Sequence, residues 1–330
     1  MQKTKAGEKP RIVLIGAVGS TKVSLHKLAE HQANLVGVFG YESESTEHVS
    51  GYTDLAAIAA EGGYHYFSFK KINSEADKIR SLKPDYIFVI GLSQMVSTEI
   101  LAIPSVCCIG FHPTSLPQGR GRAPLTWLIL DQQSEGSATF FVLSDGVDSG
   151  AIVVQRKFPV SDNDDVSNLI DKTYQAMGSA LDELLPALTT DVPKAREQNE
   201  AHATYYEKRV PEDGLINWSW SADEIVRLIR ATTSPYPGAF SFVDDQRITV
   251  FTARKYMECR VQGVPGRILR IGGNGSFVVQ CGTGLLEVLQ YVTKWPWSPL
   301  VGADLGYKGE FEIYLLKKRV DQLEQLLASR

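Results

Sequence analysis

The chain has 330 residues, of which 43 % are hydrophobic and 22 % charged, and its formal net charge at pH 7 is −4. The length exceeds that of one ordinary domain and the composition is that of a folded protein, so we expect two domains. The negative charge argues against a general nucleic-acid binder, and no apolar run reaches the roughly 20 residues of a membrane span. We therefore expect a cytoplasmic protein without a signal peptide, which binds neither nucleic acid nor a membrane.

Short apolar strands alternate with helices over the first 110 residues. We predict strands at residues 11–16, 35–39, 64–69, 86–90 and 106–109, and helices at residues 21–31, 54–61, 74–82 and 97–102. Ser20 and Asn73 are the expected N-caps of the first and third helix. The alternation predicts an α/β fold with a Rossmann-like, doubly wound, mostly parallel sheet, which binds ligands at the carboxyl ends of its strands. The glycine spacing after residue 16 does not match a dinucleotide fingerprint, which argues against an NAD-dependent dehydrogenase.

The remaining chain predicts an edge hairpin, a long helix and a second domain. A helix at 123–130 precedes hairpin strands at 139–143 and 152–156, and a long helix then runs from about Asp165 to Leu185. We predict a catalytic domain at 1–204, a small OB-like β-barrel at 205–305 and a terminal helix at 306–330. The elements expected in the second domain are a helix at 222–231, which a Ser221/Glu224 capping box begins, and strands at 215–218, 239–243, 248–253, 266–270, 276–280 and 284–291.

Two further features concern the end of the chain and its thiols. Apolar residues at helical spacing predict that the terminal helix docks on its own domain, with a dimer contact as the second choice. The four cysteines, Cys107, Cys108, Cys259 and Cys281, lack the spacing of a metal site. We interpret them as reduced structural thiols and expect no metal.

The candidate site is the stretch 110–122, which reads Gly-Phe-His-Pro-Thr-Ser-Leu-Pro-Gln-Gly-Arg-Gly-Arg. His112 lies just past the end of the predicted buried strand 106–109, and Asp148 lies in a second polar turn between two apolar strands. A lone histidine or a Pro/Gly loop is commonly structural, and a short motif by itself is weak evidence. A histidine and an aspartate at strand ends together indicate an acid/base pair.

These motifs resemble the folate-dependent formyltransferase family. The loop is similar to the family signature, in which Asn-x-His precedes a Ser/Leu/Pro loop and Arg-Gly, and Asp148-Ser149-Gly150 is similar to its Asp-x-Gly segment. Residues 205–240 resemble the family members that formylate UDP-4-amino-4-deoxy-arabinose. The resemblance spans nearly the whole chain and implies a sugar N-formyltransferase, with N10-formyltetrahydrofolate as the formyl donor and a nucleotide-linked amino sugar as the acceptor.

The resemblance and the residue chemistry together imply roles for particular side chains. His112 is the expected base and Asp148 the group that orients it. The candidates for the pterin cleft are Gly91, Leu92, Ser93, Gln94 and Met95. The candidates for the phosphate or sugar are Arg120, Arg122, Lys208, Arg209 and Tyr236, because guanidinium groups match phosphate oxygens and a tyrosine ring can stack on a base.

One position departs from the family pattern, because Gly110 stands where the family has its catalytic asparagine. An oxyanion would then need another donor: a backbone N–H near Gly110, the side chain of Thr114 or Ser93, or a water molecule. Gly110 is alternatively interpreted as making room for a bulky sugar. The residues do not decide among these alternatives.

Two other functions compete with the sugar enzyme. A methionyl-tRNA formyltransferase ranks second, because the region where those enzymes carry a basic insertion is here the short acidic stretch 41–51. A non-catalytic sensor of folate or of a nucleotide sugar ranks third, because both His112 and Asp148 are retained. We expect UDP rather than dTDP as the nucleotide, a role in surface-glycan assembly and a possible homodimer, all from the resemblance alone.

Overall fold

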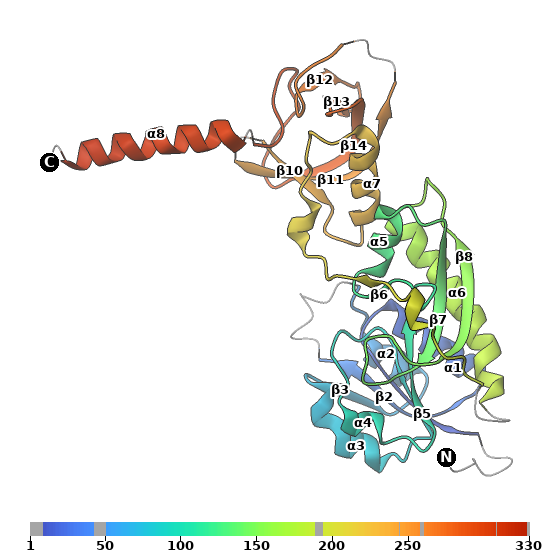
Figure 1. Ribbon diagram of the computed structural model, residues 1–330. Helices are drawn as coiled ribbons and strands as arrows, with labels where there is room; N and C mark the ends of the chain where they lie inside the picture. Colours follow the sequence, from blue (N-terminus) through green and yellow to red (C-terminus); the bar gives the residue numbers. More distant parts are fainter. Residues whose placement is uncertain are drawn as a thin grey trace. The chain divides into compact units, whose positions relative to one another are not determined.

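The structure is a computed structural model that describes residues 9–42, 51–188, 194–243, 245–257, 261–307 and 309–328. The chain divides into two compact units, Met1–Arg209 and Val210–Arg330 (Figure 1). The first unit runs beyond residue 204 because β9 (Tyr205–Tyr206) pairs in parallel with β6 (Arg120–Gly121). The segment at the predicted boundary is thereby hydrogen-bonded into the first unit.

A seven-stranded sheet forms the centre of the first unit. Its strand order is β3-β2-β1-β4-β5-β7-β8, with β1 to β5 parallel and β7 and β8 antiparallel at one edge. The strands are β1 (Arg11–Gly16), β2 (Asn34–Tyr41), β3 (Tyr66–Phe69), β4 (Tyr86–Val89), β5 (Cys107–His112), β7 (Glu135–Val142) and β8 (Ile152–Pro159). This arrangement confirms the predicted Rossmann-like fold, and the order of the strands reverses between β1 and β4. Sheets of this kind bind ligands at such a reversal.

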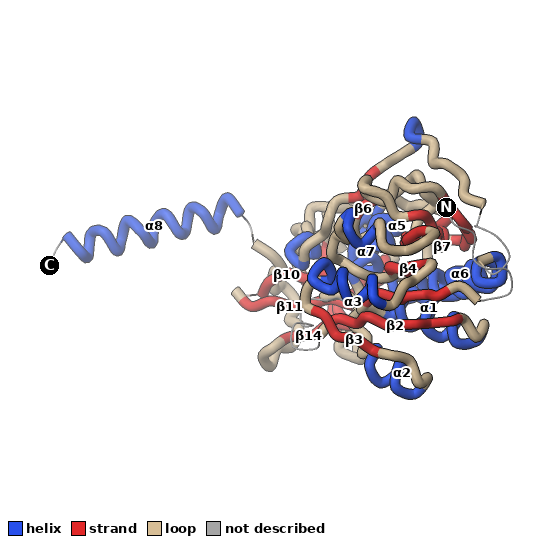
Figure 2. Tube along the Cα trace, turned by 90° about the horizontal axis from the view of Figure 1, so that it is seen from below, coloured by secondary structure: helices blue, strands red, loops and turns tan. Residues whose placement is uncertain are grey.

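Helices cover both faces of this sheet, and their apolar residues form two cores. Leu25, Leu55 and Met177 share one core and come from α1 (Gly19–Glu30), α2 (Leu55–Glu61) and α6 (Val166–Ala187). Ile79 and Ile100 belong to the other core and come from α3 (Ala76–Ser81) and α4 (Thr98–Leu101). Figure 2 shows α2 and α3 on opposite sides of β2 and β3.

Three local predictions are corrected by the structure. Val18 is the N-cap of α1, so Ser20 lies inside the first turn. Asn73 does not cap α3: it lies in a 3-10 turn (Ile72–Glu75), where its amide donates to Met95 O (3.1 Å) and its side-chain oxygen accepts from Ser97 N (2.9 Å). Residues 215–218 do not form a strand, because Asn217 Oδ1 accepts from Ser219 N (3.0 Å) and turns the chain.

The second unit contains a five-stranded antiparallel sheet in the order β10-β11-β14-β13-β12. Its strands are β10 (Ala239–Val243), β11 (Gln246–Tyr256), β12 (Ile268–Ile271), β13 (Phe277–Gln280) and β14 (Leu285–Thr293). Among the residues described, the ladder does not close between β12 and β10, so the small β domain expected from the sequence is an open sheet. The predicted Ser221/Glu224 capping box is present at the start of α7 (Ala222–Thr232).

The terminal helix α8 (Gly309–Ala328) forms as predicted, but its described apolar side chains between Ile313 and Leu327 are exposed and not docked on the second unit. Residues such as Leu316 and Leu327 are 65 % and 71 % exposed. Four features of the sequence analysis lie outside the residues described: the polar start 1–8, acidic positions 43–50, residues 189–193 and Cys259. Within the described ranges, no helix combines the length and the apolar character needed to cross a membrane.

Candidate active site

His112 is the last residue of β5, whereas the sequence analysis predicted that the strand ends at residue 109 and that the histidine lies just beyond it. Its exposed fraction is only 5 %, and its Nε2 lies 2.8 Å from Gly119 O. The loop after β5 folds back on itself to bring this carbonyl to the ring, since Thr114 Oγ1 donates to Gln118 O (2.8 Å). Gly119 N in turn donates to Thr204 Oγ1 (2.8 Å), which fixes the loop to a distant part of the chain.

Asp148 lies beside the histidine ring, with its Oδ2 3.5 Å from His112 Nδ1. The residue adopts a left-handed backbone (φ 48°), which aspartate tolerates better than most residues. The same Oδ2 accepts a hydrogen bond from Gly121 N (2.9 Å). Gly121 itself has φ 103°, and a Cβ there would lie 2.3 Å from Tyr206 O, so only glycine fits at this donor position. The two polar turns singled out in the sequence therefore meet in the folded chain.

These contacts determine what the imidazole can do. Gly119 O can only accept, so the bond to it requires a proton on Nε2 of His112. In the neutral ring the lone pair then lies on Nδ1, the nitrogen that faces Asp148. A proton taken up at Nδ1 would lie between the ring and the Asp148 carboxylate, which stabilises the resulting positive charge.

Residues 91–95 follow β4 at the reversal of the strand order. Leu92 is half-buried against the core, whereas Ser93 is exposed and Met95 is 69 % exposed. Gln94 anchors the segment, because its Oε1 accepts from Ile72 N (2.9 Å) and its Nε2 donates to Lys70 O (2.8 Å). Since Val89 of β4 pairs with residue 110 of β5, the segment 91–95 extends along the same sheet edge as His112.

Gly110 has no spare room beside it. It is a buried residue of β5 paired with Phe141, and a Cβ built on it would lie 2.6 Å from Leu143 Cδ2 and 3.1 Å from Phe141 Cζ. The interpretation that Gly110 makes space for a bulky sugar is therefore wrong, because Leu143 and Phe141 fill that space.

Arg120 is fully buried (0 % exposed) and its guanidinium is committed to protein partners. It donates to Gln198 Oε1 (2.9 and 3.2 Å), to both carboxylate oxygens of Glu200 (2.6 and 2.9 Å) and to Tyr205 Oη (2.8 Å). The hydrogen bond from Arg120 lowers the pKa of Glu200. A buried arginine with these partners holds the chain together, which corrects its expected use for a phosphate.

The other predicted cations lie on two neighbouring segments of the first unit. Arg122 and Lys208 are exposed, and Arg122 N donates to Tyr206 O (3.0 Å). Arg209 lies over the ring of Trp127, 5.1 Å from its centroid. Tyr236 is half-buried and belongs to the second unit.

The sequence analysis placed a domain boundary after residue 204 and assigned no role in the site to the polar stretch 194–206. Gln198 Nε2 donates to Asp148 O and to Gly150 O, both at 2.7 Å, and Thr204 holds the loop that carries Gly119. The stretch therefore clamps both turns of the site. No residue pattern distinguishes such a clamp from an ordinary polar connection.

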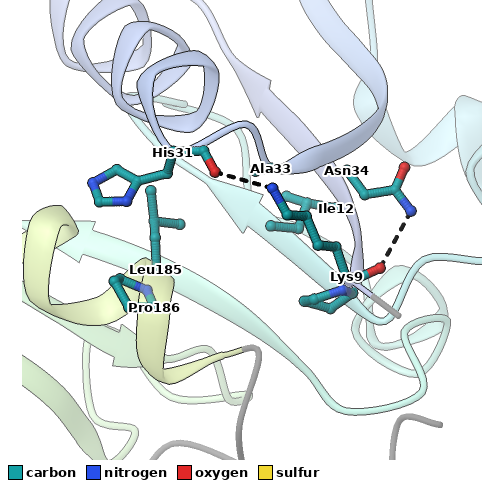
Figure 3. A pocket seen from close by; sticks show the side chains of 8 residues that line it. Lys9, Ile12, His31, Ala33, Asn34, Leu185 and Pro186 are labelled. Carbon is teal, nitrogen blue, oxygen red and sulfur yellow. Dashed lines mark hydrogen bonds between the residues drawn. The ribbon is translucent and has the colours of Figure 1, made fainter. Parts of the chain in front are cut away.

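Two hollows of the first unit differ in their position relative to His112. One of about 820 Å³ is bordered by the loop 114–119 and by Gln155, Arg196, Gln198 and His202, all in the first unit. Another, of about 190 Å³, lies at the amino end of β1, where Lys9 Nζ donates to His31 O (3.5 Å) and Asn34 Nδ2 donates to Lys9 O (3.3 Å) (Figure 3). Because β1 and β5 run in the same direction through the sheet, the small hollow is at the edge opposite to His112 and takes no part in the site.

Comparison with known proteins covers most of the chain. Residues 22–185 match the family model "Formyl transferase", and residues 208–294 match "Formyl transferase, C-terminal domain".

Several solved structures share the fold, among them the three that follow. HypX from Aquifex aeolicus, in complex with tetrahydrofolic acid, is 18 % identical (TM-score 0.63), over 88 % of this chain and 45 % of HypX. This chain thus spans about half the length of HypX. An N-formyltransferase from Helicobacter canadensis, in complex with folinic acid and dTDP-3-aminofucose, is 16 % identical (TM-score 0.66; 85 % of this chain, 99 % of that one). A methionyl-tRNA formyltransferase from Clostridium thermocellum is 21 % identical (TM-score 0.53; 75 % and 94 %).

Proposed function

The chain belongs to the formyl transferase family, and from this premise we propose that it is a sugar N-formyltransferase. It moves a formyl group from N10-formyltetrahydrofolate to the amine of a nucleotide-linked amino sugar. The observation that carries this proposal is the 3.5 Å contact between His112 Nδ1 and Asp148 Oδ2 at the ligand-binding edge of the sheet, inside the matched region. Support for the sugar comes from the Helicobacter canadensis enzyme, whose whole length this chain matches in fold.

His112 and Asp148 handle the proton that the reaction must move. When bound, N10-formyltetrahydrofolate supplies the formyl carbon, to which the sugar amine adds before the bond to N10 breaks. His112 Nδ1 takes the proton that the attacking amine loses and then returns it to the leaving nitrogen. Asp148 stabilises the imidazolium between these two transfers, and the bond from Nε2–H to Gly119 O keeps the ring in the orientation that this needs.

The oxyanion requires a donor other than the missing asparagine. Of the two hydroxyls considered, Thr114 Oγ1 already donates to Gln118 O, whereas Ser93 is exposed on the segment that continues from β4. We assign the role to Ser93. Replacing it, in Ser93→Ala, is expected to lower kcat by about 100-fold with little change in KM, since one oxyanion donor contributes about this much.

The donor and the acceptor bind to different features of the first unit. Leu92 and the exposed Met95 offer apolar surface at the strand-order reversal, which suits a flat pterin ring. Arg122, Lys208 and Arg209, on two adjacent segments, are suited to the phosphates of the nucleotide. Arg120 is not assigned to the substrate, because its hydrogen bonds are made within the protein.

A screen of amino sugars tests the proposal. The full chain is incubated with N10-formyltetrahydrofolate and with UDP- or dTDP-linked amino sugars, and the mass gain of one formyl group is followed. The resemblance of residues 205–240 favours UDP, whereas the Helicobacter canadensis structure carries a dTDP sugar, so the two sets of sugars separate these alternatives.

The second candidate, a methionyl-tRNA formyltransferase, rests on the fold shared with the Clostridium thermocellum enzyme. Charged initiator tRNA is therefore included in the same screen. Formylation of the tRNA and of no sugar would reverse our ranking. Tight binding of folate and sugar without turnover would instead indicate the non-catalytic sensor.

A further inference from the structure

The terminal helix α8 exposes an apolar stripe along one side. Its members are Ile313, Leu316, Val320, Leu323 and Leu327, and their exposed fractions range from 48 % to 71 %. Figure 1 shows α8 as one unbroken helix. In proteins, a helix such as this one of 20 residues gains most of its stability from packing of its apolar face. Such a stripe is therefore expected to be covered in solution.

The spacing of the apolar residues in the stripe indicates that a second helix covers it. Its positions are separated by three and four residues alternately, which is the a/d pattern of a coiled coil. Ile313 and Val320 fall at a positions, and Leu316 and Leu323 at d positions. Within parallel coiled coils, β-branched residues at a with leucine at d favour two strands over three or four.

The charges beside the stripe favour the same arrangement. In a parallel, in-register pair, Glu312 at g faces Lys317 at e of the second copy, and Arg319 at g faces Glu324 at e of the second copy. Both pairs are attractive. In an antiparallel pair with Val320 opposite Leu316, Arg319 would face Arg319 and Lys317 would face Lys317. Like charges therefore disfavour this antiparallel register.

We propose that α8 pairs with α8 of a second copy of this chain as a parallel two-stranded coiled coil, which makes the protein a homodimer. The outer face supports this assignment, because Lys318 lies over the ring of Tyr314 (5.1 Å) at positions f and b, away from the a/d seam. The inference does not depend on the reaction that the first unit catalyses.

Substitutions that reverse the charges beside the stripe, made in the full chain, test whether α8 pairs with a second copy. Sedimentation velocity over a range of protein concentrations is expected to give a dimer for the wild type. Glu324→Lys turns both symmetry-related Arg319–Glu324 pairs repulsive and is expected to raise the dissociation constant by about tenfold. Adding Arg319→Glu restores opposite charges and is expected to bring the constant back to near the wild-type value. Gln325→Lys, at the outer f position, is the matched control and should change little.

A cross-linking experiment tests the orientation. In the parallel pair Leu323 faces Leu323, so Leu323→Cys is expected to form an oxidised dimer on a non-reducing gel, whereas Gln325→Cys and the wild type do not. A wild-type monomer at every concentration would overturn the proposal. So would a dimer that neither Glu324→Lys weakens nor the double exchange restores, or a Leu323→Cys protein that cross-links no better than Gln325→Cys.

Discussion

Restoring the family asparagine, in Gly110→Asn, is expected to destabilise this protein. A Cβ at position 110 would lie 2.6 Å from Leu143 Cδ2 and 3.1 Å from Phe141 Cζ, whereas carbon atoms in contact are normally about 3.5–4.0 Å apart. Overpacking of this kind costs about 1–3 kcal/mol, and burying a carboxamide among apolar groups adds about 1–3 kcal/mol. We expect the free energy of unfolding to fall by roughly 2–6 kcal/mol.

The assay is urea unfolding of the full chain, followed by far-ultraviolet circular dichroism. Adding Leu143→Ala to Gly110→Asn removes the side chain in the way and should recover part of the loss relative to the sum of the single variants. Gly273→Asn is the matched control, because nothing lies within 4 Å of a Cβ built there. Two results would contradict this prediction. In one, Gly110→Asn unfolds at the same urea concentration as the wild type. In the other, adding Leu143→Ala recovers none of the free energy of unfolding that Gly110→Asn loses.

Three further outcomes follow from the contacts described. Asp148→Asn keeps the size of the side chain but removes its charge, so we expect formyl transfer to slow by about 10²–10⁴-fold at unchanged folding, as measured by initial rates and circular dichroism. Arg120→Met breaks the bonds to Gln198, Glu200 and Tyr205 and should lower the free energy of unfolding by roughly 1–3 kcal/mol. Arg120 lowers the pKa of Glu200 in the folded protein. The stability that the Arg120–Glu200 pair contributes is therefore fully present above the pKa that Glu200 has in the unfolded chain. It is lost as the pH falls through the lower pKa that Glu200 has in the folded chain. In urea titrations, the difference in the free energy of unfolding between wild type and Arg120→Met should thus become smaller as the pH is lowered. A difference that becomes larger would contradict this prediction. Burial raises the pKa of Cys108 to about 12, so iodoacetamide at pH 8 should label it much more slowly in the folded than in the unfolded chain, by peptide mass spectrometry.

Regular apolar patterns made most of the fold predictable. The strands of the central sheet are short apolar runs between turn residues, and β10 (Ala239–Val243) was predicted with its observed bounds. One error arose where a polar side chain bonds to a distant backbone instead of to its own helix. Asn73 has the residue type of an N-cap, yet it holds the segment that starts at Met95. Local sequence does not contain that partner.

The site was predictable in its residue types but not in its connections. His112 and Asp148 follow from their strand-end positions, and the structure places them within 3.5 Å. The Gly119 carbonyl that sets the tautomer of His112, and Gln198 that holds the turn of Asp148, depend on loop geometry. The tight packing at Gly110 is likewise a property of β5 against its neighbour β7, and not of the loop motif.

The central claim is that His112 carries the proton of a formyl transfer from a reduced folate to a sugar amine. It is tested most directly with N10-formyltetrahydrofolate labelled with carbon-13 in the formyl group, by measuring the label on the amino sugar for the wild type and for His112→Asn. We predict that the wild type transfers the label and that His112→Asn, at equal folding, does so about 10²–10⁴-fold more slowly. Equal rates of labelling by the two proteins would contradict the account.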